Sequence, residues 1–310
     1  MKRILDQVEG IKWPGATCIE NAYAALMSYY GDDCELLFGE VLGIHVNPQE
    51  NDRLVVEEDM PEVMEGVFYY KRKEIPEFDY IAMKDYVDDG IPLLVEVDAF
   101  NVPYLKQYKK YHHPHTLLIH GYDEKFFYCV DPNITTTQEK RIALEDLAGC
   151  YKFGYAFSKK GCIDNMLIYN NSIKKILNED YMREYDMLLC RLKKNAVIRQ
   201  GIEGYDSEDL GISPLFLQIK RIAGKHYLFT YFIDFFEQKY GERGLSGLKN
   251  ELEKIGENWH NYRMKLIHML LTDPNAFDKL GIWDRYLDEI YCMEEAWRVK
   301  LSKAYLLSEK

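Results

Sequence analysis

Residues 13–21 read WPGATCIEN and place a cysteine at the start of a predicted helix. A Pro-Gly pair interrupts the chain, and Thr17 with Glu20 three residues later forms a T-x-x-E capping box. Apolar residues then recur with helical spacing as far as Gly31. Cys18 is therefore predicted to be the first helical residue, where unpaired amides and the positive end of the helix dipole favour a thiolate.

The position of Cys18 suits a nucleophile, because the amides at a helix start can also stabilise a tetrahedral oxyanion. A cysteine in a first turn more often serves packing than chemistry, and a thiolate nucleophile needs a base. The seven cysteines are widely spaced and include no C-x-x-C pair, which is typical of reduced thiols rather than of disulfides or a zinc ribbon. Most of them are interpreted as buried small side chains.

Three apolar segments of the first half have the composition of strands. They are residues 93–97 (LLVEV), 116–122 (TLLIHGY) and 126–130 (FFYCV). The last two are separated by residues 123–125 (DEK), a spacing that suits a tight antiparallel hairpin.

This hairpin brings together a base and an acid. His115 opens its first strand and Asp131 follows its second, so the antiparallel arrangement predicts that the two side chains are neighbours. A histidine oriented by a carboxylate is what a thiolate nucleophile requires. The sequence therefore predicts a Cys18–His115–Asp131 triad.

Other interpretations of these residues remain open. Residues 112–115 (HHPH) could bind a metal ion, although the proline stiffens the run and no cysteine or carboxylate at ligand spacing completes a site. His120, five residues after His115, is predicted to point to the opposite face of the strand and to be structural. Asp131 and Pro132 also fit a simple turn.

The second half of the chain is predicted to be helical. Its longest apolar stripe alternates steps of three and four and is interpreted as the core of a helical bundle: Leu245, Leu248, Leu252, Ile255, Trp259, Tyr262, Leu266 and Met269. Residues 227–236 and 283–301 predict two further amphipathic helices. We therefore expect a catalytic domain over residues 1–160 and a helical domain over residues 161–310 that packs on it.

Composition limits the partners and the compartment. The 39 basic and 51 acidic side chains leave a formal charge of -12, so nucleic acid is not expected as a partner. No apolar run approaches the roughly 18 residues of a membrane span, and the N-terminus does not resemble a signal peptide. We expect a cytoplasmic protein without membrane association. No phosphate-binding glycine loop is present to suggest nucleotide-dependent chemistry.

Five motifs carry a family resemblance: ATCIENAYAALMSYYG (16–31), ELLFGE (35–40), EVDAFNVPY (96–104), HTLLIHGYD (115–123) and VDP (130–132). In this order they resemble the N-terminal domain of the butirosin biosynthesis protein H family, a papain-like relative of the peptidases that trim double-glycine leader peptides. The resemblance covers residues 10–160 and extends more weakly into residues 224–236 and 287–297. It implies an α+β, papain-like cysteine-protease fold, with an N-terminal helix packed on an antiparallel sheet, followed by an α-helical domain.

The resemblance also implies a cysteine-dependent acyltransferase of natural-product biosynthesis, such as that of antibiotics. Such an enzyme forms an amide bond by moving an acyl group from a carrier-protein thioester to a small-molecule amine. By motif position, Cys18 is the nucleophile, His115 the base and Asp131 the third member. No bound cofactor is expected, since the acyl group arrives on the phosphopantetheine arm of an acyl or peptidyl carrier protein.

The chain departs from the papain-like pattern at one point. These enzymes usually place a glutamine shortly before the cysteine, but residues 11–17 contain none and Gln7 is distant, so the second oxyanion donor is not identified. Two other functions fit the same residues: a cysteine peptidase or amidase that uses water, and a non-catalytic binding protein on a papain-like shell. The lysines at 106, 109 and 110 are candidates for docking an acidic carrier protein, although they also suit a solvated loop.

Overall fold

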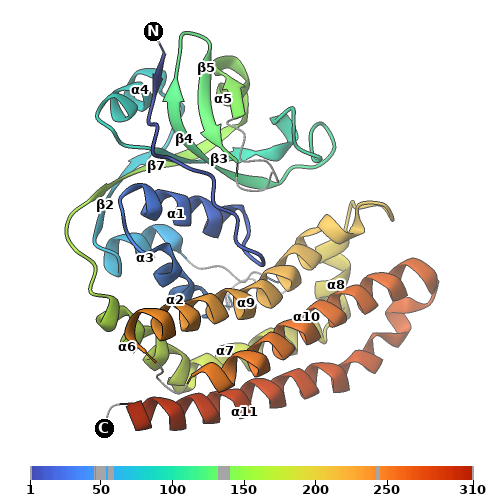
Figure 1. Cartoon of the computed structure of the whole chain (residues 1–310). Coiled ribbons are helices and arrows are strands. Elements are labelled where there is room, and N and C mark those ends of the chain that lie inside the picture. The colour runs from blue at the N-terminus through green and yellow to red at the C-terminus, as the bar shows by residue number, and fades with distance from the viewer. Residues whose placement is uncertain are drawn as a thin grey trace. The chain divides into compact units, whose positions relative to one another are not determined.

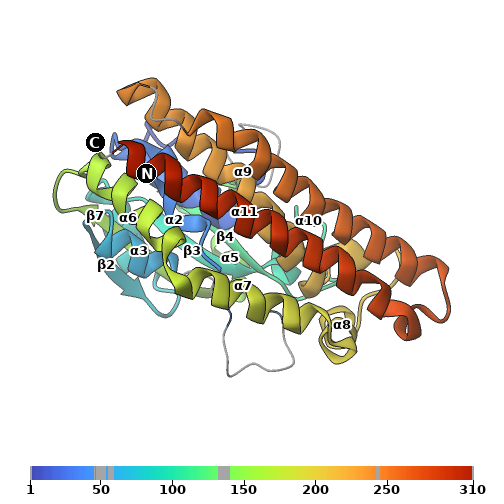
Figure 2. The same ribbon diagram turned by 90° about the horizontal axis from the view of Figure 1, so that it is seen from below.

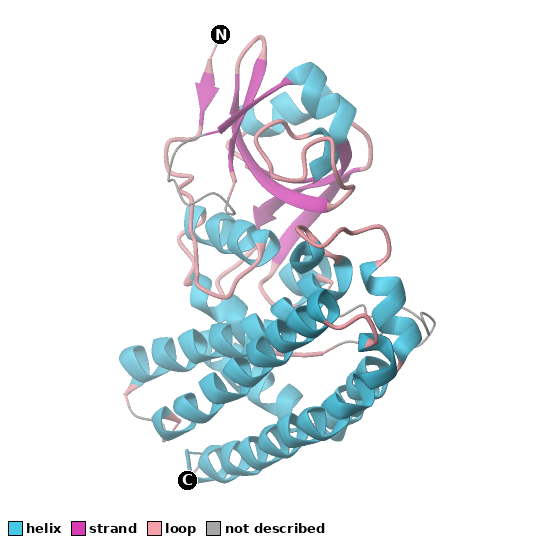
Figure 3. Cartoon of the chain, turned by 90° about the vertical axis from the view of Figure 1, so that its right-hand side faces the viewer, coloured by secondary structure: helices cyan, strands magenta, loops and turns pink. Residues whose placement is uncertain are grey.

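The computed structural model describes residues 2–44, 46, 54, 59–131, 140–241 and 245–308. The chain divides into two compact units. The first comprises Met1–Cys34 and Asp59–Asp164, and the second comprises Glu35–Glu58 and Asn165–Lys310. All described strands belong to the first unit, whereas the described elements of the second are helical (Figure 3). The sequence predicted one boundary, after residue 160, and did not single out the segment that joins the helical unit.

The first unit is built on one antiparallel sheet of seven strands. Their order is β2-β7-β3-β4-β5-β6, with β1 paired to β4. The strands are β1 (Arg3–Ile4), β2 (Tyr70–Ile75), β3 (Leu93–Asp98), β4 (Pro114–Tyr122), β5 (Phe126–Val130), β6 (Lys140–Ala143) and β7 (Tyr151–Lys159). The three strands predicted from the sequence correspond to β3, β4 and β5, and the predicted hairpin between β4 and β5 is confirmed.

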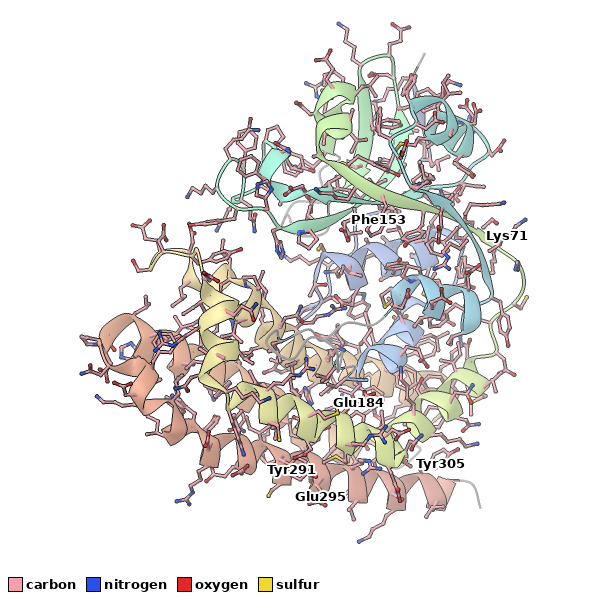
Figure 4. All side chains as sticks on the ribbon, turned by 180° about the vertical axis from the view of Figure 1, so that it is seen from behind. Lys71, Phe153, Glu184, Tyr291, Glu295 and Tyr305 are labelled. Atoms are coloured by element: carbon pink, nitrogen blue, oxygen red, sulfur yellow. The ribbon has the colours of Figure 1, made fainter. Side chains whose placement is uncertain are left out.

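The helix predicted to follow Thr17 is α1 (Cys18–Tyr29), which packs against β4 (Figure 1). The first unit also contains three helices that were not predicted from the sequence: α3 (Met60–Gly66), α4 (Tyr80–Asp88) and α5 (Leu144–Cys150). Aspartate side chains cap the first two of these helices, but all three are too short to show a long apolar period. Lys71 on β2 and Phe153 on β7, both exposed, are labelled in Figure 4.

The second unit is a set of packed helices, and α9, α10 and α11 run side by side in it (Figure 2). Its helices are α2 (Leu37–Val41), α6 (Asn165–Leu177), α7 (Glu179–Leu192), α8 (Asn195–Ile202), α9 (Pro214–Tyr240), α10 (Ser246–Thr272) and α11 (Asp284–Ser308). Every residue of the predicted 245–269 stripe is buried, so its interpretation as core is confirmed. No described helix is long and apolar enough to cross a membrane.

The glycine of the ELLFGE motif lets α2 approach α9 and α6 closely. A Cβ atom on Gly39 would lie 2.5 Å from the ring of Phe232 and 2.6 Å from the hydroxyl of Ser172. A Cβ atom does not come this close to another heavy atom, so any larger residue forces these side chains or their helices to shift. This contact holds part of Glu35–Glu58 within the helical unit.

The expected α+β architecture is therefore present. An antiparallel sheet carries an N-terminal helix on β4, and a helical region follows. The first unit contains all three predicted site residues.

Candidate active site

The start of α1 has the geometry that the capping box predicts. Thr17 has extended backbone angles, and its hydroxyl oxygen accepts a hydrogen bond from the Ile19 amide at 3.2 Å. The Glu20 carboxylate in turn accepts from the Thr17 amide at 2.8 Å and from the Thr17 hydroxyl. Cys18 is the first helical residue, as predicted.

The capping box leaves one amide of the first turn available. The amides of Thr17 and Ile19 are bonded within the box, and the Glu20 amide donates to the Thr17 side chain. No described residue accepts a hydrogen bond from the Cys18 amide. The helix dipole is positive at this end, so the free amide and the dipole both favour negative charge at Cys18.

His115 and Asp131 meet across the β4–β5 hairpin. The register pairs Leu118 with Val130, which brings the residue after β5 beside the start of β4. The Nε2 atom of His115 lies 2.8 Å from Oδ2 of Asp131. Both side chains are buried, at 3% and 4% exposure, so water competes weakly for this hydrogen bond. The bond to Asp131 leaves Nδ1 as the ring nitrogen that can serve a thiol.

Cys18 also interacts with the His115 imidazole, through charge and a hydrogen bond. Burial on its own would lower the pKa of His115, but charge interaction and hydrogen bonding with Cys18 and Asp131 outweigh it and raise the pKa to about 10. The raised pKa favours the imidazolium form of His115, whose ring lies beside Cys18 and the Asp131 carboxylate. The structure brings the three predicted residues together in one buried cluster.

The charge interaction between Cys18 and His115 gives a direct spectroscopic prediction. A raised pKa means that the protonated ring stabilises the folded state fully below its ordinary pKa near 6.5, and this stabilisation is lost as pH rises towards about 10. Cys18→Ala removes the largest interaction that raises the value. NMR titration of His115 should therefore give a clearly lower pKa in Cys18→Ala than in the wild type. Equal values in both proteins would show that the thiol does not act on the ring.

A second histidine–aspartate pair fixes the segment between β3 and β4. Nδ1 of His112 lies 2.6 Å from Oδ2 of Asp98, and the ring of His112 stacks on Phe100 with centroids 4.4 Å apart. Burial on its own would raise the pKa of Asp98, but hydrogen bonds from His112 and from the amides of Phe100 and His113 lower it. Burial and the positive charge of His115 lower the pKa of His113. These contacts anchor the chain just before the candidate base.

Tyr104 belongs to the same segment and was not among the predicted site residues. Burial and the charges of Cys129 and Asp131 raise the pKa of its hydroxyl, which places this group beside the candidate acid. Tyr104 is the last residue of the EVDAFNVPY motif, but that motif does not reveal its proximity to Asp131, which depends on tertiary folding.

The alternatives for the histidine run can now be compared with the structure. His112 bonds Asp98, whereas His115 bonds Asp131, so the two rings serve different carboxylates. In the described part of the chain, no three histidine, cysteine or carboxylate side chains come together as metal ligands. His120 is buried, as expected of a structural residue. Pro132, which the sequence analysis associated with a turn, lies outside the described residues.

A cysteine at a helix start, beside a histidine–aspartate pair on an antiparallel sheet, is the layout of papain-like cysteine hydrolases and transferases. The fold and the cluster together give the first unit this layout. Residues 44–132 match the family model described as butirosin biosynthesis protein H, N-terminal. The predicted resemblance is therefore confirmed over this segment, which includes His115 and Asp131 and begins after Cys18.

Two further comparisons bear on the chain. No curated protein shows a significant match to it. Among solved structures, the chain is similar to one described as a C39-like peptidase from Bacillus anthracis, with 16% sequence identity and a TM-score of 0.41. The similarity covers 52% of this chain and 99% of the other.

Proposed function

We propose that this protein forms amide bonds by moving an acyl group from a carrier-protein thioester, through an acyl-Cys18 intermediate, to an amine. The observation that carries the proposal is the position of His115, which interacts with Cys18 and bonds Asp131 at 2.8 Å. A thiolate beside an imidazolium is the reactive form of a cysteine nucleophile.

In the first step the Cys18 thiolate attacks the carbonyl carbon of the thioester. The carbonyl oxygen becomes an oxyanion, which the Cys18 amide is suited to stabilise, because no described residue accepts a hydrogen bond from it. When the tetrahedral intermediate collapses, the carbon–sulfur bond of the donor breaks and the leaving thiolate takes the proton of the His115 imidazolium. The acyl group is then bound to Cys18 as a new thioester, and His115 is neutral.

In the second step an amine attacks the acyl-Cys18 carbonyl. Neutral His115 removes a proton from the attacking nitrogen, and Asp131 stabilises the imidazolium that forms. Collapse of the second intermediate releases the amide and returns the Cys18 thiolate. An amide is more stable than a thioester, so the two steps together need no nucleotide hydrolysis to drive them.

The donor and the acceptor follow from the same proposal. A thioester donor suits the phosphopantetheine arm of an acyl or peptidyl carrier protein, with a small-molecule amine as acceptor and no cofactor held by the enzyme. The matched family model is named for a protein of butirosin biosynthesis, which supports a role in making an antibiotic or a related natural product.

The exposed lysines of the β3–β4 segment are proposed to dock the carrier protein. Charge reversal of Lys106, Lys109 and Lys110 to glutamate should slow acylation by an acidic carrier protein about tenfold or more, since rim charges act mainly on association. Acylation by a small pantetheine thioester should change by less than about twofold. Stopped-flow rates with both donors measure this difference.

The matched control reverses three exposed lysines elsewhere in the first unit, Lys71, Lys73 and Lys160, and should leave both rates unchanged. If charge reversal at Lys106, Lys109 and Lys110 slowed acylation equally with both donors, the docking proposal would be contradicted, because a small thioester makes no carrier-protein contact.

Product analysis separates the proposed transferase from a hydrolase. The enzyme is supplied with an acyl pantetheine thioester and a series of primary amines, and the amide and the free acid are quantified by mass spectrometry. We expect the amide to predominate with at least one amine and to be absent with Cys18→Ala. Free acid alone, at every amine concentration, would instead identify a cysteine hydrolase.

A further inference from the structure

Asn21 is a buried polar residue one turn after Cys18, and its side chain is fully engaged with the backbone before that cysteine. Its exposure is 1%. Oδ1 accepts a hydrogen bond from the Trp13 amide at 2.8 Å, and Nδ2 donates to the Thr17 carbonyl at 2.9 Å. One side chain therefore bonds both ends of the segment 13–17.

The segment that Asn21 spans contains a tight turn. The Ala16 amide donates to the Trp13 carbonyl at 3.1 Å, and Gly15 has a φ of 90°. Proline at the second position and a glycine of positive φ at the third define a type II turn. The turn fixes its own four residues, but it does not fix how they join the helix. The capping box and the Asn21 backbone amide, which donates to the Thr17 carbonyl at 3.3 Å, hold the last residue of this segment, and the Asn21 side chain adds a bond to each end of it.

We propose that Asn21 is a positioning residue that holds the peptide units before Cys18 so that the Cys18 amide can stabilise the oxyanion. This inference rests on the proposed acyl-transfer function and adds a residue to it. The hydrogen bonds of the capping box use the amides of Thr17 and Ile19 and leave the Cys18 amide unfixed. The direction of the Cys18 amide is therefore set by the orientation of the Thr17–Cys18 peptide plane. The Thr17 carbonyl bonded by Asn21 is part of that same peptide plane.

Fixing this plane matters because an oxyanion donor works only at short range and in the right direction. Loss of one such donor costs about 10²- to 10³-fold in rate, and a displacement of about 1 Å can cost about 10²-fold. Asparagine suits the task since it offers one acceptor and one donor. Alanine offers neither and leaves the Trp13 amide and the Thr17 carbonyl without this partner.

Two reactions of the same thiol distinguish positioning of the amide from other roles. Alkylation by iodoacetamide needs the thiolate but forms no oxyanion, whereas acylation by a pantetheine thioester needs both. In Asn21→Ala we expect acylation to fall about 10- to 100-fold, while alkylation of Cys18 changes less than about threefold. Alkylation is quantified on the peptide that carries Cys18, because Cys162, Cys190 and Cys292 are exposed and also react.

The helical unit offers a closely matched control. Nδ2 of Asn258 also donates to the carbonyl four residues earlier, at 2.8 Å, and Oδ1 also accepts one hydrogen bond, from Tyr286 at 2.9 Å. Asn258→Ala should leave both rates at the wild-type level. Asn21→Ser is a second variant that restores a small polar group, and it should show an intermediate loss of acylation with normal alkylation.

Each outcome of this experiment is decisive. Equal loss of alkylation and acylation in both Asn21 variants would make the residue structural only, and unchanged acylation would overturn the proposal. Wild-type enzyme that is alkylated at Cys18 but never acylated by thioesters would instead overturn the proposed function, and the inference with it.

Discussion

Replacing Cys18 by alanine is expected to abolish the covalent acyl-enzyme and to reduce amide formation by about 10⁴-fold or more, as is usual when a nucleophile is lost. The effect is large because the thiolate forms the bond on which both steps depend. Steady-state rates of amide formation from a pantetheine thioester measure the loss. The variant should stay folded, since alanine fits the first turn of a helix.

Cys34 is the matched control for this substitution. It belongs to the same unit and has the same exposure as Cys18, 8%. Cys34→Ala should retain the wild-type rate of transfer. A comparable loss in both variants, or full activity in Cys18→Ala, would exclude Cys18 as the nucleophile.

Replacing His115 by alanine is expected to reduce acylation by about 10³- to 10⁵-fold and also to destabilise the fold. The catalytic loss follows because the leaving thiolate would lose its proposed proton donor. The loss of stability follows because Asp131 would remain buried without its partner, which costs about 3–5 kcal/mol for a buried pair. Acylation rates and urea unfolding measure the two effects separately.

Substitution of His120 is a control that distinguishes the catalytic loss from the loss of stability expected in His115→Ala. It is buried on the same strand, β4, but lies five residues further along. His120→Gln should lower the free energy of unfolding while retaining acylation by folded protein. If His115→Ala kept its acylation rate in the folded state, His115 would be a structural residue.

The local features of the site could be predicted from the sequence. The T-x-x-E box and the Pro-Gly pair fixed Cys18 as the first residue of α1, because both signals act within a few residues. The three-residue turn between β4 and β5 set the antiparallel register, and that register brought Asp131 beside His115. Each of these inferences depends on contacts between residues close in the sequence.

The remaining features depend on contacts that the sequence does not encode locally. Tyr104 reaches Asp131 through tertiary folding, and Asp98 bonds His112 across fourteen residues of the β3–β4 segment. Gly39 joins the helical unit through a close contact with Phe232, far along the chain. Asn21 reads as an ordinary helical residue until its two partners are located. Tertiary packing decides such positions.

Cys18 lies outside the segment that matches the family model. The match over residues 44–132 includes the proposed base and acid but begins after the proposed nucleophile. The assignment of Cys18 therefore depends on its place at the helix start and on its interaction with His115. A test of the nucleophile is for this reason the most informative test of the whole mechanism.

Intact-protein mass spectrometry after exposure to a simple acyl pantetheine thioester provides that test. Wild-type protein should gain the mass of one acyl group, lose it when a suitable amine is added, and release an amide, whereas Cys18→Ala should gain nothing. An adduct of equal yield on Cys18→Ala, or no adduct on the wild type with either small thioesters or an acylated carrier protein, would contradict the account.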